Sequence, residues 1–96
     1  MLTAHFMQRV SERLGPEVDP TALARHILYG LDTGDTAFVC RINRQGLRCF
    51  RFKAFDGRTF YTLIDTEEMS IVTVLPPGFR IHREGKDPID LKEIDL

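Results

Sequence analysis

Three side chains near the start of the chain have the spacing of one helical face. His5, Arg9 and Arg13 are four residues apart, and residues four apart lie on the same side of an α-helix. Guanidinium groups match phosphate oxygens with two parallel hydrogen bonds, and a neighbouring histidine exchanges protons near neutral pH. The pattern indicates a site that binds a phosphodiester and moves its proton. The alternative is a solvated face, on which Arg9 and Arg13 pair with Glu12 or with acids near the C-terminus.

A short amphipathic helix is expected to position these cations. Phe6, Val10 and Leu14 recur every four residues and predict the buried stripe of a helix over Ala4–Leu14, with Thr3 as its N-cap. The cationic stripe is rotated by about 100° from the apolar one, because successive residues turn by that angle. The cations should therefore lie at the edge of the core.

A second helix follows with clear end signals. Asp19 is the expected N-cap, Pro20 takes the first helical position, and Gly30 comes after the last turn. His26 lies on this helix and is most simply a partly buried surface side chain. The three histidines are scattered without the spacing of metal ligands, so no metal site is predicted.

After residue 35 the hydrophobic period changes from that of helices to that of strands. Four stretches are rich in β-branched and aromatic residues: 36–42, 47–53, 59–65 and 70–75, with a short fifth at 79–83. The links are too short for crossovers, so the strands should pair antiparallel. We expect an α+β fold, with two N-terminal helices packed on one face of a four- to five-stranded antiparallel sheet. This domain should span residues 1–83, followed by a loosely attached acidic tail, 84–96, with an edge strand near Ile89–Leu91.

Composition limits the partners that the whole chain can attract. The chain has 96 residues, of which 43% are hydrophobic and 28% charged, with a formal net charge of -1. These values are ordinary for one small globular domain. Binding to nucleic acid would need a local basic patch. The first residues lack the apolar core of a signal peptide and no stretch is long enough to span a membrane, so we expect a cytoplasmic protein.

A local basic patch is available in the middle of the chain. Residues 41–58 carry six cations against one acid. Phe50 and Phe52 alternate with Arg51 and Lys53, and such interleaving suits base stacking and phosphate contacts. The alternative is that the two phenylalanines are core residues beneath the helices. The candidate nucleic-acid-binding residues are Arg41, Arg44, Arg48, Arg51, Lys53, Arg80 and His82.

Two cysteines flank the first hairpin turn. If Ile42 pairs with Leu47, then Cys40 lies directly opposite Cys49. The two could form a cross-strand disulfide or a redox pair, or remain buried, reduced and unreactive. A bulge at Gly46 would separate them.

The stretches HFMQRVSERLG, FDGRTFYTLID and SIVTVLPPG together resemble a family of small bacterial and phage proteins. That family has an early His-x3-Arg-x3-Arg helix and a late strand ending in a V-T-V type segment. It is grouped with the barnase/EndoU/colicin/RelE-like fold, whose members are mostly metal-independent ribonucleases and toxins. The resemblance covers residues 3–78 or so. It places the helix motif on His5, Arg9 and Arg13, and the strand motif on 72–74.

The resemblance implies a site for RNA cleavage without metal or cofactor. A base would take the 2′-OH proton, an acid would protonate the leaving oxygen, and cations would hold the phosphate. His5 would be the base or the acid, while Arg9 and Arg13 would bind phosphate. The candidate partners from the sheet are Arg58, Tyr61 and Thr73.

Two functions follow from these observations. The first is a non-catalytic binding or accessory domain of phage or mobile-element type, whose partner is a protein or a nucleic acid. The alternative is a toxin-like, metal-independent ribonuclease. The expected partners are RNA, a protein such as a cognate inhibitor, or a second copy of the chain, but not a membrane. Catalysis requires His5, an arginine and a sheet residue to meet at one phosphate-sized pocket, whereas binding requires only a continuous patch.

Overall fold

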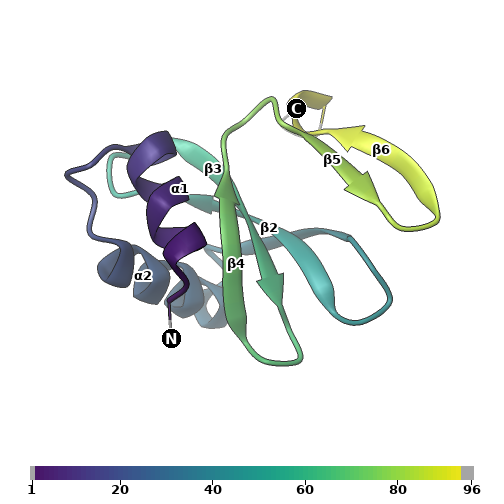
Figure 1. Cartoon of the computed structure of the whole chain (residues 1–96), viewed down its shortest axis with the longest axis horizontal. Helices are drawn as coiled ribbons and strands as arrows, with labels where there is room; N and C mark the ends of the chain where they lie inside the picture. Colours follow the sequence, from purple (N-terminus) through teal and green to yellow (C-terminus); the bar gives the residue numbers. More distant parts are fainter. Residues whose placement is uncertain (1, 94–96) are drawn as a thin grey trace.

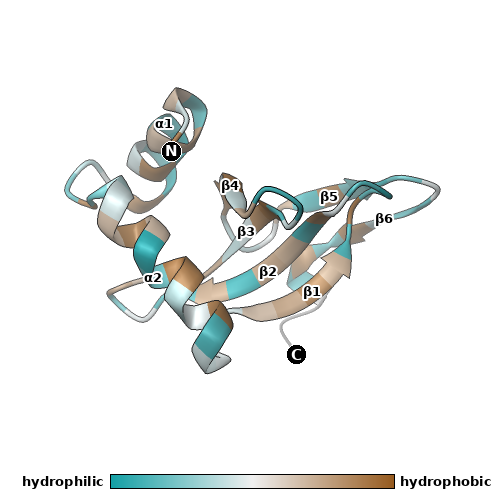
Figure 2. Cartoon of the chain, turned by 90° about the horizontal axis from the view of Figure 1, so that it is seen from below, coloured by the Kyte–Doolittle hydropathy of each residue, from teal (hydrophilic) through white to brown (hydrophobic). Residues whose placement is uncertain are grey.

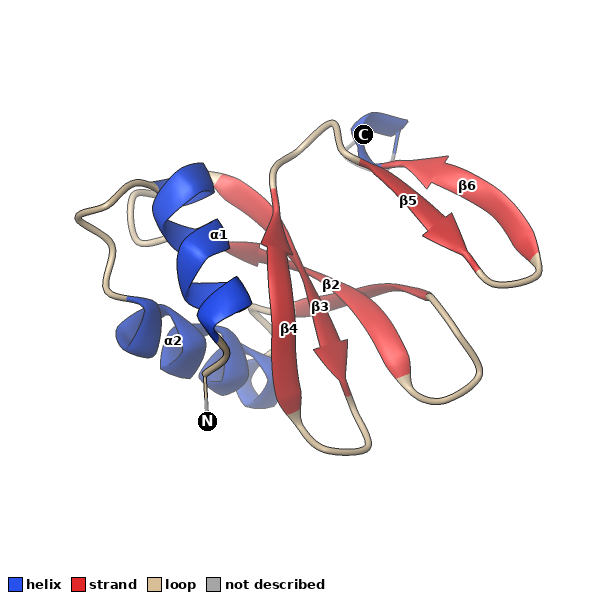
Figure 3. Ribbon diagram, viewed as in Figure 1, coloured by secondary structure: helices blue, strands red, loops and turns tan. Residues whose placement is uncertain are grey.

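The computed structural model describes residues 2–93 and has the expected α+β architecture (Figures 1 and 3). Two helices precede a four-stranded antiparallel sheet, which is followed by a β-hairpin and one turn of 3-10 helix. The elements are α1 Ala4–Leu14, α2 Pro20–Thr33, β1 Ala37–Arg41, β2 Leu47–Lys53, β3 Thr59–Asp65, β4 Ser70–Leu75, β5 Arg80–Arg83, β6 Lys86–Asp90 and η1 Leu91–Glu93.

Helix α1 has the predicted bounds, cap and buried face. The Thr3 hydroxyl accepts a hydrogen bond from the backbone N–H of Phe6 at 3.0 Å, which satisfies one of the unpaired donors of the first turn. Phe6, Val10 and Leu14 are all buried. Burial of this stripe fixes the rotation of the helix, and with it the direction of the neighbouring cations.

Helix α2 is longer than predicted. It continues through Gly30 to Thr33, and Gly34 provides the left-handed C-cap with a φ of 88°. Gly30 instead makes room for the returning chain. A Cβ atom at this position would lie 2.2 Å from the hydroxyl oxygen of Thr36, which donates to the backbone carbonyl of Ile27 at 2.8 Å. The glycine that resembled a stop signal is therefore a packing requirement.

The sheet has the order β1-β2-β3-β4, with each strand antiparallel to the next. Strand β2 alternates as predicted. Phe52 pairs with Phe60 and faces the helices, while Arg51 pairs with Tyr61 on the opposite face. Strand β1 is shorter than β2: its first residue, Ala37, lies opposite Arg51. The last two residues of β2 therefore extend beyond β1.

Both faces of the sheet are covered. One apolar cluster joins the two helices to the sheet through Phe52, Phe60, Ile64 and Val74. The second cluster lies on the other face, where Ile81 of β5 and Leu91 of η1 join residues of the sheet. The helices and the β5–β6 hairpin lie on opposite sides of the sheet (Figures 1 and 2). Figure 2 also shows that both helices carry apolar and polar residues. The sheet is thus the middle layer of three.

The segment after residue 83 differs from the loosely attached tail that we expected. Strand β5 does not join the main sheet, but pairs with β6 in a separate hairpin. Leu91 is fully buried, and its N–H donates to the carbonyl of Phe79 at 2.9 Å. Glu84 donates its N–H to Ile42 and forms an ion pair with Arg44 at 3.5 Å. The segment is therefore attached to the rest of the fold at Glu84 and at the buried Leu91, while 94–96 lie outside the described residues.

A substitution at Leu91 tests this packing. Leu91→Ala should reduce the free energy of unfolding by about 2–5 kcal/mol, because it leaves a cavity in the second apolar cluster. Urea denaturation measures the loss. Lys92→Ala, at the exposed neighbouring residue, is the matched control and should change stability by less than about 0.5 kcal/mol. Equal effects of the two substitutions would show that the segment does not contribute to the folded core.

Candidate functional site

The structure brings together two of the predicted site residues, Arg13 and Arg58. Arg13 comes from the last turn of α1 and Arg58 from the turn between β2 and β3. They line one shallow pocket of about 470 Å³, together with Thr59, Phe60, Pro76 and Pro77. Two guanidinium groups from distant parts of the chain thus share one concave surface.

Backbone contacts hold each arginine in position. The Nη1 group of Arg13 donates to the carbonyl of Val74, at the end of β4. The Nη2 group of Arg58 donates to the carbonyl of Leu14 at 3.2 Å, at the end of α1. These bonds tie the C-terminal end of α1 to the sheet. They have a structural role whether or not a ligand binds.

Aromatic rings and one carboxylate further orient the two guanidinium groups. The central carbon of the Arg13 guanidinium lies 5.5 Å from the ring centroid of Phe79, and that of Arg58 lies 5.1 Å from Phe60. Both distances are within the range of a cation–π contact. Asp56 accepts the Nε–H of Arg58 at 2.5 Å, and the backbone N–H and the charge of Arg58 lower the pKa of this carboxyl. The arginine side chains are therefore held in place before any ligand arrives.

The two arginines retain donors for an anion. Each guanidinium has five N–H donors. Among the residues that the structure describes, the hydrogen bonds above use one donor of Arg13 and two side-chain donors of Arg58. Burial, and then the charge of Arg9, lower the pKa of Arg13, but arginine stays protonated in proteins. The pocket can therefore offer two guanidinium groups, of which Arg58 is paired with Asp56, and several directed donors to a phosphate group.

The rest of the cationic stripe does not reach this pocket. His5 is exposed in the first turn of α1. It lies about 12 Å from Arg13 along the helix axis, since each of the eight intervening steps rises about 1.5 Å. Arg9 pairs with Glu12 at 2.9 Å, as the alternative interpretation of the stripe expected.

Tyr61 and Thr73 lie on the far side of the sheet from α1. Tyr61 is fully buried in the cluster beneath the β5–β6 hairpin. Thr73 is also buried, and it pairs with Leu63, which packs against the same cluster. Residues that pair directly across two strands point to the same face. The sheet therefore separates both side chains from a ligand held by Arg13.

The predicted nucleic-acid-binding residues are divided among several surfaces. Arg41 and Arg44 line a hollow beside Glu84, at the β1–β2 turn. Arg48 faces the helix side and donates to the carbonyls of its own turn. Arg51 and Lys53 are exposed near the other end of β2. Arg80 and His82 are exposed on β5.

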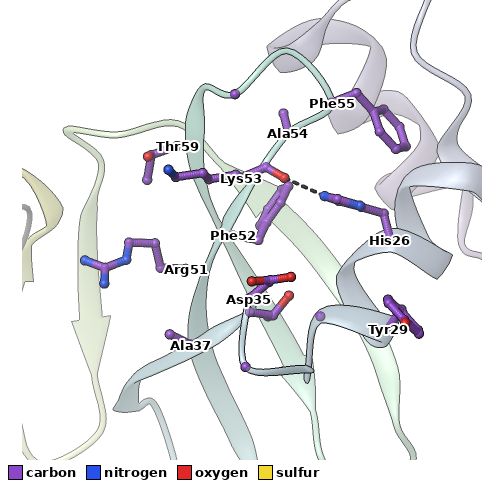
Figure 4. Close-up of a pocket in the computed structure, with 14 residues that line it drawn as sticks. His26, Tyr29, Asp35, Ala37, Arg51, Phe52, Lys53, Ala54, Phe55 and Thr59 are labelled. Carbon is purple, nitrogen blue, oxygen red and sulfur yellow. Dashed lines mark hydrogen bonds between the residues drawn. The ribbon is translucent and has the colours of Figure 1, made fainter. Parts of the chain in front are cut away.

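A larger groove lies where β2 extends beyond β1 (Figure 4), and the sequence did not reveal it. Its volume is about 630 Å³. His26 of α2 reaches the edge of β2, where its Nε2 lies 2.6 Å from the backbone oxygen of Lys53. The ring of Phe55 lies against His26 with centroids 4.8 Å apart, and Tyr29 lines the same groove. One signal was available: His26 and Tyr29 are three residues apart, and so share a helix face.

The cysteines have the predicted arrangement. Ile42 donates to the carbonyl of Leu47 at 2.9 Å, and Cys40 lies opposite Cys49. The bulge is in β1, between Phe38 and Cys40, and not at Gly46. Both thiols are buried and reduced, and they form a hydrogen bond with each other. Burial raises the pKa of both, most strongly for Cys49. A thiol that stays protonated is a poor nucleophile.

Comparison with known proteins adds no family. No family model, curated protein or solved structure matches this chain significantly. Within residues 2–93, no three His, Cys, Asp or Glu side chains gather in a group that could hold a metal ion. Neither α1 nor α2 is long and apolar enough to cross a membrane.

The buried thiols predict a loss of stability in alkali. A thiol ionises near pH 9 when the chain is unfolded, whereas burial keeps Cys49 protonated in the folded protein. The unfolded state then binds fewer protons, so the free energy of unfolding should fall as the pH rises above about 9, by up to about 1.4 kcal/mol per pH unit for this group. Urea denaturation between about pH 8 and about pH 10.5 measures the slope.

Cys49→Val is the control, because it removes the titrating group and keeps a buried apolar side chain. Its stability should fall less steeply with pH than that of the wild type. Parallel curves for the two proteins would contradict a protonated Cys49 as the cause.

Proposed function

We propose that the chain is a non-catalytic binding domain that holds the phosphate backbone of RNA between Arg13 and Arg58. One observation carries this proposal: two guanidinium groups, held by rings and backbone carbonyls, share a pocket and retain N–H donors. Guanidinium groups bind phosphate with directed pairs of hydrogen bonds. The net charge of -1 offers no general attraction for RNA, so affinity must come from such a local site.

The distribution of the other polar groups favours binding over cleavage. Attack by a 2′-OH needs a base, and an acid within hydrogen-bond reach of the leaving oxygen. His5 is about 12 Å away along the helix, and Tyr61 and Thr73 lie beneath the hairpin. The pocket supplies phosphate contacts without a neighbouring group from the predicted catalytic set that could move the proton.

The motif resemblance supports RNA as the partner. The stretches that carry Arg13 and Arg58 are those that resemble the small bacterial and phage family grouped with the RelE- and barnase-like proteins. The members of that group act mostly on RNA. An accessory protein of a phage or mobile element that binds RNA without cutting it accounts for the resemblance and for the position of His5 away from the pocket.

Removal of either arginine should weaken RNA binding. Arg13→Gln and Arg58→Gln should each raise the Kd for a single-stranded RNA of about 12 nucleotides by about tenfold, equal to about 1.4 kcal/mol. Each should also reduce the slope of log K against log salt by about 0.7, because one phosphate contact is lost. Fluorescence anisotropy of labelled RNA at several salt concentrations measures both quantities.

Two further variants make this result specific. Arg44→Gln removes the same charge at the opposite end of β2, beside Glu84, and should leave the Kd within about twofold of the wild type. Arg13→Lys keeps the charge without the planar pair of donors and should bind with intermediate affinity. An equal loss of RNA affinity for Arg44→Gln and Arg13→Gln would show that the protein binds RNA through its overall positive charges and not through a specific pocket.

The ribonuclease alternative has its own test. We expect the wild-type protein to leave a mixed RNA pool intact when no metal is added, because His5, Tyr61 and Thr73 do not lie beside the phosphate pocket and its two arginines stay protonated. Gel analysis after prolonged incubation detects cleavage. Cleavage by the wild type that is lost in folded Arg9→Ala and His5→Ala proteins would establish the ribonuclease and reject the non-catalytic proposal.

A further inference from the structure

The groove beside α2 displays aromatic rings that are not covered. Tyr29 is 69% exposed and Phe55 is 59% exposed. Exposed rings that gather at one concavity are typical of a binding surface. Tyr29 and Phe55 thus line one groove of about 630 Å³, with His26 between them (Figure 4).

A contact with His26 holds the Phe55 ring in place. It lies against the imidazole of His26 with the ring planes 46° apart, and His26 is itself held by the backbone oxygen of Lys53 at 2.6 Å. Figure 4 shows His26 and Phe55 on one side of β2 and the side chains of Arg51 and Lys53 directed to the other. The fixed ring and the cations therefore border the groove from opposite sides of the strand.

The charges give the groove two unlike ends. Lys53 and Thr59 lie near the β2–β3 turn, while Asp35 lies near the end of α2 (Figure 4). An anionic group is favoured beside Lys53 and disfavoured beside Asp35. A ligand that carries a phosphate is therefore favoured at the Lys53 end of the groove, where Phe55 also lies.

The groove and the arginine pocket both border the β2–β3 turn. Thr59 lines both hollows. A third hollow, of about 400 Å³, lies between them and is bordered by Phe55 and Arg58. The three hollows therefore follow one another around residues 54–59, and each shares a lining residue with the next.

We propose that this groove is the base-binding subsite of the domain, in which Phe55 stacks a nucleobase of single-stranded RNA and Tyr29 lines the same groove, while Arg13 and Arg58 hold a nearby phosphate. This inference rests on the proposed function and extends it. The bases of a duplex are stacked on one another and have no free face, so the site selects single strands. Stacking depends little on which base is present, so the subsite adds affinity with weak sequence preference.

The first test separates base contacts from phosphate contacts. Phe55→Ala should raise the Kd for single-stranded RNA about tenfold, within the range for loss of a base–aromatic stack. It should leave the Kd for an abasic strand of the same length unchanged, whereas Arg13→Gln should weaken both strands. Phe38→Ala is the matched control, because Phe38 is 58% exposed on β1 and also lies against one ring, Phe50, yet does not line the groove.

A base-bearing RNA that binds Phe55→Ala and Phe38→Ala equally well would overturn the base subsite, while the loss with Arg13→Gln would still support the phosphate site. Failure of the wild type to bind either strand would overturn the proposed function. The groove would then be judged by NMR, with adenosine monophosphate and ribose 5-phosphate as probes. Upfield shifts of the Tyr29 and Phe55 ring protons with the nucleotide alone would support base stacking, and their absence would reject it.

Discussion

The architecture depends on a sheet that is apolar on both faces. Along β3, Phe60 and Ile64 point to the helices while Tyr61 points to the hairpin, and all three are buried. A strand with this pattern exposes a large apolar surface unless both sides are covered. The two helices cover one face, and the β5–β6 hairpin with Leu91 covers the other. The C-terminal segment is therefore part of the core and not an appendage.

This three-layer arrangement restricts where a ligand can bind. Neither face of the sheet has a central open surface, so concave surfaces form where layers end. The three hollows used in the proposals lie around the turn between β2 and β3, beside one or both helices. Arg13 and Arg58 contribute to folding and to the site at once, because the hydrogen bonds that join α1 to the sheet also aim their guanidinium groups.

Local patterns predicted most of the fold. The bounds of α1, the three longest strands and the pairing of the cysteines follow from caps, periodicity and hairpin turns, all of which depend on neighbouring residues. The end of α2 did not follow, because Gly30 is needed for contact with Thr36 and that contact forms only when the chain returns. The position of the C-terminal segment also depended on distant partners. Leu91 has charged neighbours in the sequence, but it packs among apolar side chains in the folded protein.

The candidate site was predictable in part for the same reason. Residue type and helical spacing singled out Arg13, and Arg58 was named as a candidate partner from the sheet. Their meeting depends on how α1 crosses β4, which the sequence does not state. The position of Tyr61 was available from alternation, because Phe60 and Ile64 had to face the helices. The aromatic groove could not be predicted from the sequence, because its shape depends on where β1 ends relative to β2.

That early stop of β1 has a further consequence for how the protein behaves in a crowded solution. A strand edge with unpaired backbone groups is a template on which another chain can add, and such addition leads to aggregation. Here the imidazole of His26 forms a hydrogen bond with the backbone carbonyl of Lys53, on the part of β2 that is not paired with β1. A side chain from a helix thus takes the position of a missing strand, and the edge offers one acceptor fewer to a stray β-strand. The same residue that supports a ring in the groove also protects the sheet from its neighbours.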